Sequence, residues 1–155
     1  MPDMIFQVSD LAQNRLQVLK AARAGGARVR DKDGLSLIML PEGKLELLEE
    51  LVTWNAAHLR LEELLARGVA PSVSDLGDLA WLRVFDSDEL KEFLDELHRA
   101  LTASHADGTL DALRDCITAW RTTARQLDDP LRRSILRSPL GANDFVEVER
   151  PDGNS

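Results

Sequence analysis

The sequence predicts an α+β protein: a small N-terminal sheet-and-helix dimerisation domain followed by an α-helical C-terminal region. Short apolar segments separated by glycine-containing turns occupy residues 5–40, which is typical of a small sheet. Beyond residue 41, apolar residues recur every three or four positions, as on the buried face of a helix. With 44% hydrophobic residues in 155, the chain can bury a core.

The first 41 residues alternate between strand and helix signals. Ser9 is the expected N-cap of the first helix, with its hydroxyl accepting a hydrogen bond from a free backbone amide. Gly25-Gly26 ends that helix, and Asp31–Gly34 is typical of a hairpin turn. The expected elements are a strand over 5–8, a helix over 11–24, and strands over 27–31 and 35–40.

A long helix is predicted over 42–67. Its leucines cover two faces, so we expect it to pack both on its own sheet and on a further surface. A second copy of the chain is the simplest candidate, which predicts a homodimer. The Gly-, Pro- and Ser-rich segment 68–79 resembles a linker.

The second half of the chain predicts helices. Asp86 and Glu89 have the spacing of a capping box, and Asp107-Gly108 ends the helix that they begin. Thr109 is the expected cap of the next helix, and Asp129-Pro130 introduces a short one that ends at Arg137. The predicted units are a DNA-binding and dimerisation domain over 1–70, an acidic helical region over 71–138 and an irregular tail over 139–155.

The sequence gives little support to membrane insertion, secretion or catalysis. No apolar run approaches the roughly 18 residues of a membrane span, and the N-terminus lacks a secretory pattern. A single cysteine, Cys116, fits a reducing compartment and a packing role. His98 and His105 share a helix face, where solvated histidines are commoner than metal ligands. We therefore expect a soluble cytoplasmic protein that is not an enzyme and has no metal or cofactor.

Charge is distributed unevenly along the chain. Residues 1–70 carry 9 basic and 10 acidic side chains, whereas residues 71–155 carry 10 and 17. Residues 11–30 contain five cations and no acid. Arginine pairs with phosphate or guanine, and asparagine suits adenine. The residues expected to contact DNA are Asn14, Arg15, Arg28, Arg30 and Lys32.

The acidic half carries aromatic residues within a run of carboxylates. Such a surface can steer and anchor a cationic protein partner. The residues expected to make this contact are Trp81, Val84, Phe85, Asp86, Asp88 and Glu89. The alternative is that the aromatic residues belong to a helical core and that the acids only solvate it.

Residues 4–48 resemble the N-terminal domain of the Phd/YefM family of type II antitoxins. The resemblance rests on the entry strand and cap Phe6–Asp10, the helix with Asn14 and Val18-Leu19, the Gly25-Gly26 gap and the hairpin Arg28–Gly34 with its following strand. It implies a homodimer that binds operator DNA as an autorepressor. It also implies a C-terminal segment that neutralises a cognate toxin, commonly a small basic ribonuclease.

Two features depart from the family pattern. The family often has an arginine three residues after the capping serine, where this chain has Ala12, and Arg15 follows one turn later. The C-terminal region is also long enough to fold as a helical unit, which makes it an extension of uncharacterised type. The alternatives are a stand-alone DNA-binding regulator with a helical oligomerisation or sensing module, and a purely structural adaptor.

Overall fold

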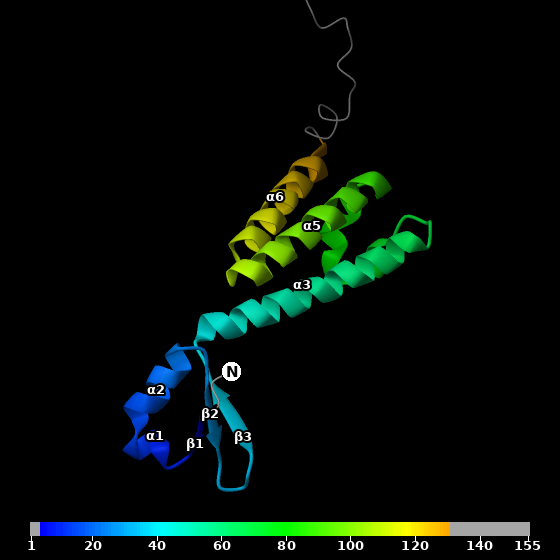
Figure 1. Cartoon of the computed structure of the whole chain (residues 1–155). Coiled ribbons are helices and arrows are strands. Elements are labelled where there is room, and N and C mark those ends of the chain that lie inside the picture. Colours follow the sequence, from blue (N-terminus) through cyan, green and yellow to red (C-terminus); the bar gives the residue numbers. More distant parts are fainter. Residues whose placement is uncertain (1–3, 131–155) are drawn as a thin grey trace, which may run out of the picture.

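The computed structural model describes residues 4–130 and has a mixed α+β fold (Figure 1). The predicted fold class is thereby confirmed at the level of α+β. The elements are β1 (Ile5–Gln7), α1 (Asp10–Gln13), α2 (Arg15–Arg23), β2 (Ala27–Arg30), β3 (Ser36–Met39), α3 (Glu42–Ala66), α4 (Val73–Leu76), the 3₁₀ helix η1 (Gly77–Val84), α5 (Ser87–Asp107) and α6 (Asp111–Asp128).

A three-stranded sheet forms the N-terminal module together with α1 and α2. The strand order is β1-β2-β3, with β1 parallel and β3 antiparallel to the central strand. Phe6, Ala27 and Val29 alternate with exposed residues along their strands and are buried with Val18 and Ala22 of α2. The predicted hairpin is confirmed, and Asp31 and Gly34 close its turn through a backbone hydrogen bond of 3.0 Å.

The single helix predicted over 11–24 is divided in two. Asn14 has a φ of −125° and a ψ of 30°, which separates α1 from α2. Ser9 occupies the N-cap position of α1 as expected, but its side chain does not make the expected capping hydrogen bond. The Asp10 carboxylate links the two ends of α1 to their neighbours: its oxygens accept hydrogen bonds from the Gln7 backbone nitrogen at 2.8 Å and from Asn14 Nδ2 at 2.9 Å.

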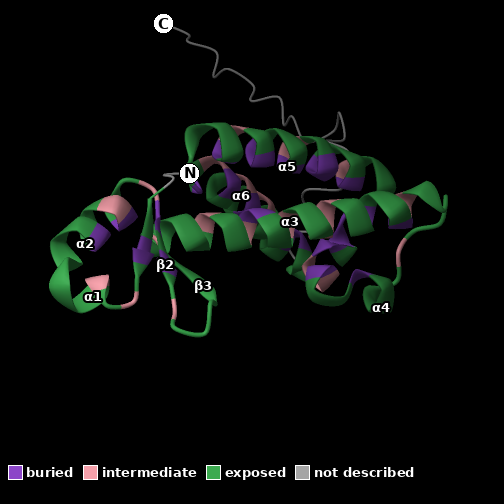
Figure 2. Ribbon diagram, turned by 60° about the horizontal axis from the view of Figure 1, so that its bottom comes forward, coloured by how far each residue is buried: buried purple, intermediate pink, exposed green. Residues whose placement is uncertain are grey.

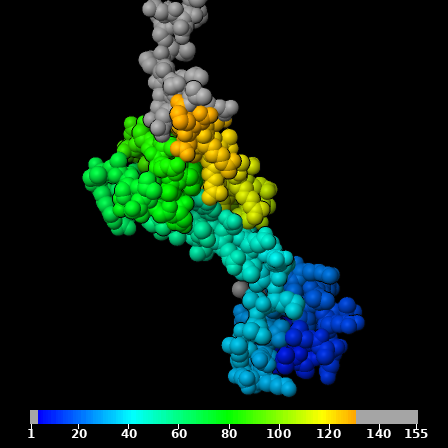
Figure 3. Space-filling model, turned by 180° about the vertical axis from the view of Figure 1, so that it is seen from behind, coloured from blue at the N-terminus to red at the C-terminus, as the bar shows by residue number. Residues whose placement is uncertain are grey.

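The long helix α3 connects two hydrophobic cores. Near its start, Lys44 Nζ donates a 2.9 Å hydrogen bond to the Gly25 carbonyl oxygen of the sheet module. Farther along, Leu51, Leu61 and Leu64 are buried in the core of the helical unit. The space-filling view shows the sheet module and the helical unit as two lobes joined by α3 (Figure 3). The cores thus separate within α3, before the boundary expected at residue 70.

The segment expected to be a linker belongs to the helical core. Ser72 and Asp75 form a reciprocal capping box at the start of α4. Leu76, Leu79 and Leu82, from α4 and η1, are all buried. These side chains belong to the same hydrophobic cluster as the buried leucines of α3, and Figure 2 shows buried positions on both α3 and α5.

The last two described helices pack against each other and complete this core. Gly108 ends α5 in the left-handed conformation, with a φ of 69°, as expected for a helix terminator. The prediction that Thr109 caps α6 was wrong, because the N-cap position is Leu110 and carries no side-chain cap. The free Leu113 amide donates to Ser104 Oγ of α5 at 3.1 Å instead. The short helix predicted to end at Arg137 and the tail 139–155 lie outside the described residues.

Candidate DNA and protein interfaces

The arginines of β2 lie on the open face of the sheet. Side chains alternate between the two faces of a strand. Ala27 and Val29 are buried against α2, so Arg28 and Arg30 point to the opposite face. The register places Ile5 and Gln7 of β1 beside them. This face is not covered by α2, because that helix packs on the side of Val29.

The other residues expected to contact DNA lie elsewhere in the sheet module. Arg15 begins α2 in the helical layer, and Lys32 lies in the turn between β2 and β3. The structure therefore draws the five residues from different layers of the sheet module. It places Arg28 and Arg30 on one face and Arg15 in the layer that covers the other.

Asn14 is engaged within the junction of α1 and α2. Its side-chain nitrogen donates to Asp10, as described above. The hydrogen bond from the Gln7 backbone amide, followed by this contact, lowers the pKa of Asp10 from its ordinary value. Asn14 thus uses one of its two side-chain N–H donors at the junction, and its second N–H and its oxygen keep the capacity to bond a ligand.

An apolar surface extends from the sheet module along α3. It begins in a groove of about 620 Å³ between β3 and the start of α3, lined mainly by Leu37, Met39 and Leu45. It continues along α3 to Val52 and Leu59, which are 69% and 65% exposed. Monomeric proteins rarely leave so continuous an apolar surface in water. This surface is suited to burial against another protein.

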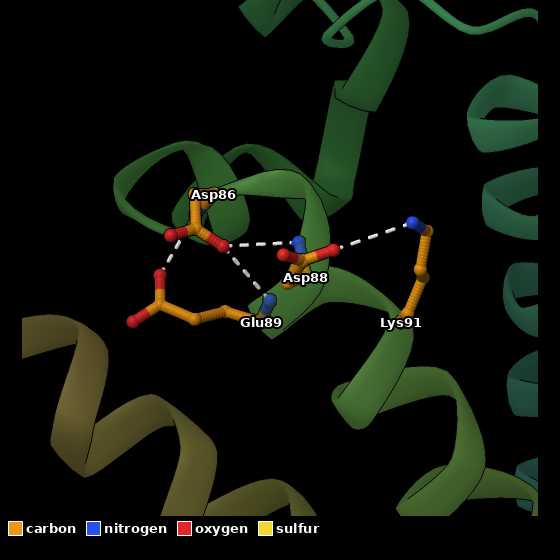
Figure 4. A network of polar contacts seen from close by, with 4 residues as sticks. All are labelled: Asp86, Asp88, Glu89 and Lys91. Atoms are coloured by element: carbon orange, nitrogen blue, oxygen red, sulfur yellow. Dashed lines mark hydrogen bonds and ion pairs between the residues drawn. The ribbon is translucent and has the colours of Figure 1, made fainter.

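The acidic residues expected to bind a partner form the start of α5 (Figure 4). Asp86 Oδ1 accepts hydrogen bonds from the backbone nitrogens of Asp88 and Glu89 at 3.0 and 2.9 Å. In turn, Glu89 Oε2 accepts a hydrogen bond of 2.8 Å from the Asp86 backbone nitrogen. The Asp88 carboxylate pairs with Lys91 Nζ at 3.3 Å, and its side chain is 95% exposed. Asp86 and Glu89 therefore cap the helix, as the sequence predicted, whereas Asp88 faces solvent.

The aromatic residues expected beside those acids lie inside the helical unit. Val84 and Phe85 are only 6% and 7% exposed. Phe85 packs edge-to-face on Trp120 with ring centroids 5.1 Å apart, and Trp81 packs similarly on Phe93 at 5.6 Å. These contacts support the alternative that the side chains belong to the core. The folded chain cannot offer Val84 and Phe85 to a partner as exposed anchors.

A further groove, which the sequence did not indicate, lies between α3, η1 and α6. It has a volume of about 750 Å³. The Arg121 guanidinium lies over two indoles, 5.9 Å from the ring centroid of Trp54 and 5.5 Å from that of Trp81, which is cation–π geometry. We call it the α3–α6 groove. Trp54 and Trp81 come from segments distant from α6, so no local pattern could reveal the site.

The hydrogen-bond donors around the α3–α6 groove differ in whether they have an acceptor. Arg60 Nη2 donates to Asp78 Oδ1 at 2.9 Å and to the Leu76 carbonyl oxygen at 3.0 Å. Trp54 Nε1 donates to Glu50 Oε2 at 3.2 Å. Trp81 Nε1 is buried and finds no acceptor among residues 4–130. A buried donor without an acceptor costs about 1–3 kcal/mol, so this indole is a place where an added acceptor would stabilise the protein.

The residues considered for metal binding or catalysis show no assembled centre. Within the described part of the chain, no group of three or more His, Cys, Asp or Glu side chains could hold a metal ion. Burial raises the pKa of the Cys116 thiol, and the nearby Glu96 carboxylate adds to the effect. The thiol is thus held in its neutral, weakly nucleophilic form.

Comparison of the chain with protein-family models, with curated proteins and with solved structures gave no match. Among the described residues, no helix has the length and apolar content needed to cross a membrane.

Proposed function

We propose that the chain is the antitoxin of a type II toxin–antitoxin system, and that its N-terminal module binds operator DNA as an autorepressor. The observation that carries the proposal is the build of the sheet module. It combines an uncovered apolar surface with a pair of exposed arginines on the open sheet face. The first feature suits self-association and the second suits phosphate contact.

Dimerisation would follow from the apolar surface around β3 and α3. Covering Leu37, Met39 and Leu45 with a second copy would remove them from water and double the number of arginines facing DNA. Two symmetric arginine pairs suit a pseudo-palindromic operator. A monomer with so few cations would have only a modest electrostatic affinity for DNA.

The toxin-binding role would belong to the solvent-facing acids of α5. Val84 and Phe85 are buried and cannot contact a toxin, whereas Asp88, Glu92 and Asp95 are all exposed and would make that contact. Because these carboxylates stand on a rigid helix, binding a basic toxin would cost the unit little conformational freedom. Helix α5 is held in place by the capping box and by its contact with α6.

A stand-alone DNA-binding regulator is the second candidate, and one observation favours it. The helical unit has its own closed core and keeps its aromatic side chains inside. A segment that wraps a toxin usually gains its apolar contacts on binding, whereas this unit has already made them. Under this alternative the helical unit serves oligomerisation or sensing.

The deciding experiment is recovery of the tagged full chain from its native host, with identification of the proteins that co-purify. The antitoxin proposal expects a stoichiometric small basic protein that arrests growth when expressed alone and is neutralised by co-expression of the chain. Replacing Asp88, Glu92 and Asp95 with Lys should abolish that rescue and leave DNA binding intact. Recovery of the chain with no such partner would contradict the antitoxin role and favour the regulator.

A further inference from the structure

A row of three arginines on α6 lies beside the α3–α6 groove, which Glu50 and Asp78 also line, although the protein as a whole is acidic. The chain has a net charge of −8, yet Arg114, Arg121 and Arg125 follow one another along α6 at spacings of seven and four residues. Such spacings place the three side chains on one face of a helix. Arg114 and Arg121 line the α3–α6 groove, and Arg121 and Arg125 line an adjoining hollow of about 260 Å³ beside Trp81.

These three arginines lack carboxylate partners within residues 4–130. The neighbouring Arg60 and Arg83 are paired with Asp78 and Asp128 at 2.9 and 3.1 Å. Arg114, Arg121 and Arg125 form no such ion pair in the described range. Arg114 also lines a hollow with Glu46, Glu49 and Glu50, whereas Arg121 lies over the faces of the two indoles. Unpaired cations beside aromatic rings and an unsatisfied indole N–H favour a ligand with carboxylates and apolar groups.

We propose that this groove holds the segment Asp144–Glu149 of the chain's own C-terminal tail. The segment reads Asp-Phe-Val-Glu-Val-Glu and so carries three carboxylates together with three apolar side chains. Its composition complements that of the groove, since the carboxylates match the arginines and the apolar groups match the indoles. Nothing in this inference depends on the antitoxin role.

The length of the chain allows this docking. The 13 residues between Pro130 and Asp144 can span at most about 45 Å when extended. Helix α6 has 18 residues and is therefore about 27 Å long. The segment can thus return from the end of α6 to any point beside Arg125, Arg121 or Arg114. An acidic partner that uses the same groove would first have to displace the tail.

The test uses the full chain labelled with ¹⁵N and follows its three indole N–H resonances. The tail variant is Asp144→Asn with Glu147→Gln and Glu149→Gln, which keeps side-chain size and removes three charges. It should shift the Trp54 and Trp81 resonances and leave Trp120 unchanged, because Trp120 Nε1 donates to Glu96 Oε2 at 2.7 Å outside the groove. Adding 0.5 M NaCl to the unmodified chain should shift the same two resonances.

A matched control removes the same charge from the outer face of α5, through Asp88→Asn, Glu92→Gln and Asp95→Asn. It should leave the Trp54 and Trp81 resonances in place. Unchanged Trp54 and Trp81 resonances in the tail variant would overturn the proposal, as would a shift that Trp120 shares.

A peptide added in trans separates tail docking from general attraction of acids. A peptide with the sequence of Asn143–Glu149, added to the tail variant, should return both resonances to their original positions. A peptide of the same composition in scrambled order should do so only at concentrations at least tenfold higher. Equal effects of the two peptides would show a groove for acidic peptides in general and would overturn the assignment to the tail.

Discussion

Ser104 is fully buried in α5, and its hydroxyl oxygen serves the neighbouring helix. Oγ accepts the 3.1 Å hydrogen bond from the Leu113 backbone nitrogen, one of the amides that a helix start leaves without an internal partner. A side chain from one helix thus caps the next, and the turn at Gly108 is fixed from both sides.

Replacing Ser104 with Ala should lower the free energy of unfolding by about 1–3 kcal/mol, because the Leu113 amide would stay buried without an acceptor. Urea unfolding followed by circular dichroism measures the change. Thr102→Ala is the matched control: this hydroxyl donates to the His98 carbonyl oxygen on the exposed side of α5, so the decrease should stay within about 0.5 kcal/mol. Equal decreases in the two variants would contradict the capping role.

The carboxylate of Asp86 has a comparable role at the other end of α5. Asp86→Ala should cost about 1 kcal/mol of stability, since the variant cannot accept hydrogen bonds from the two backbone amides that Asp86 caps. Asp88→Ala, two positions later, removes a similar charge near the helix start but no capping bond, and should cost only a few tenths of a kcal/mol. Thermal unfolding of the two variants side by side tests the difference, and reversal of their order would refute the assignment.

At the scale of the element, the helices differ in how they begin and end. Gly108 sits at a φ of 69°, a conformation that side chains other than glycine adopt at a cost, whereas Gly43 lies inside the first turn of α3 with ordinary helical geometry. Neither position has neighbouring atoms within 4 Å of an added Cβ. Any difference between substitutions at the two positions therefore reports backbone conformation alone.

Gly108→Ala should destabilise the protein by about 1–2 kcal/mol, because the left-handed conformation strains a residue with a Cβ. Gly43→Ala should instead raise stability by a few tenths of a kcal/mol up to about 1 kcal/mol, because alanine loses less backbone freedom in a helix. Differential scanning calorimetry should thus show melting temperatures that move in opposite directions. A drop in stability with Gly43→Ala would show that the first turn of α3 is not helical in solution.

Helix α3 has the largest structural role of any single element. Its first turns come directly after β3, and Lys44 there bonds the Gly25 carbonyl oxygen. Its middle and end supply Leu51, Leu61 and Leu64 to the helical core, whereas Val52 and Leu59 are exposed on another face. Three different surfaces on one helix explain why its leucines are spread so widely around the axis. The expectation that this helix packs on a surface besides its own sheet is confirmed, because its buried leucines share one core with α5 and η1. Among the described residues, none from α3 belongs to the buried core of the sheet module.

At the scale of the whole molecule, charge and apolar surface are divided between two lobes (Figure 3). The sheet lobe presents Arg28 and Arg30 together with the apolar surface at β3, and the helical lobe presents acids on α5 and arginines on α6. A molecule arranged in this way can contact partners of different charge at the same time, since the arginines of β2 and the acids of α5 lie on different lobes.

Arg28→Ala combined with Arg30→Ala should weaken binding to duplex DNA from the chain's own promoter at least tenfold at 0.1 M salt. The slope of log affinity against log salt should also fall by about 0.9 for each phosphate that the variant no longer neutralises. Fluorescence anisotropy across a salt series measures both quantities. Lys91→Ala with Arg99→Ala, which removes two cations from α5, is the control and should change neither. Unaltered affinity in the β2 variant would contradict the open sheet face as the DNA surface.

Local signals were sufficient for much of this fold. The strands around the Asp31–Gly34 turn, the extent of α3, the Asp86 capping box and the Gly108 terminator were all predicted, because each depends on residues a few positions apart. The burial of Phe85 was one of two alternatives that the sequence left open. The Asn14 break was missed although its hydrogen bonds are local, and the Ser104 cap was missed because it depends on how α5 packs against α6. The α3–α6 groove was missed for the same reason as the Ser104 cap: Trp54, Trp81 and Arg121 meet only because α3, η1 and α6 share one core. Short-range patterns specify the elements, whereas which of their faces remain exposed follows from how those elements pack.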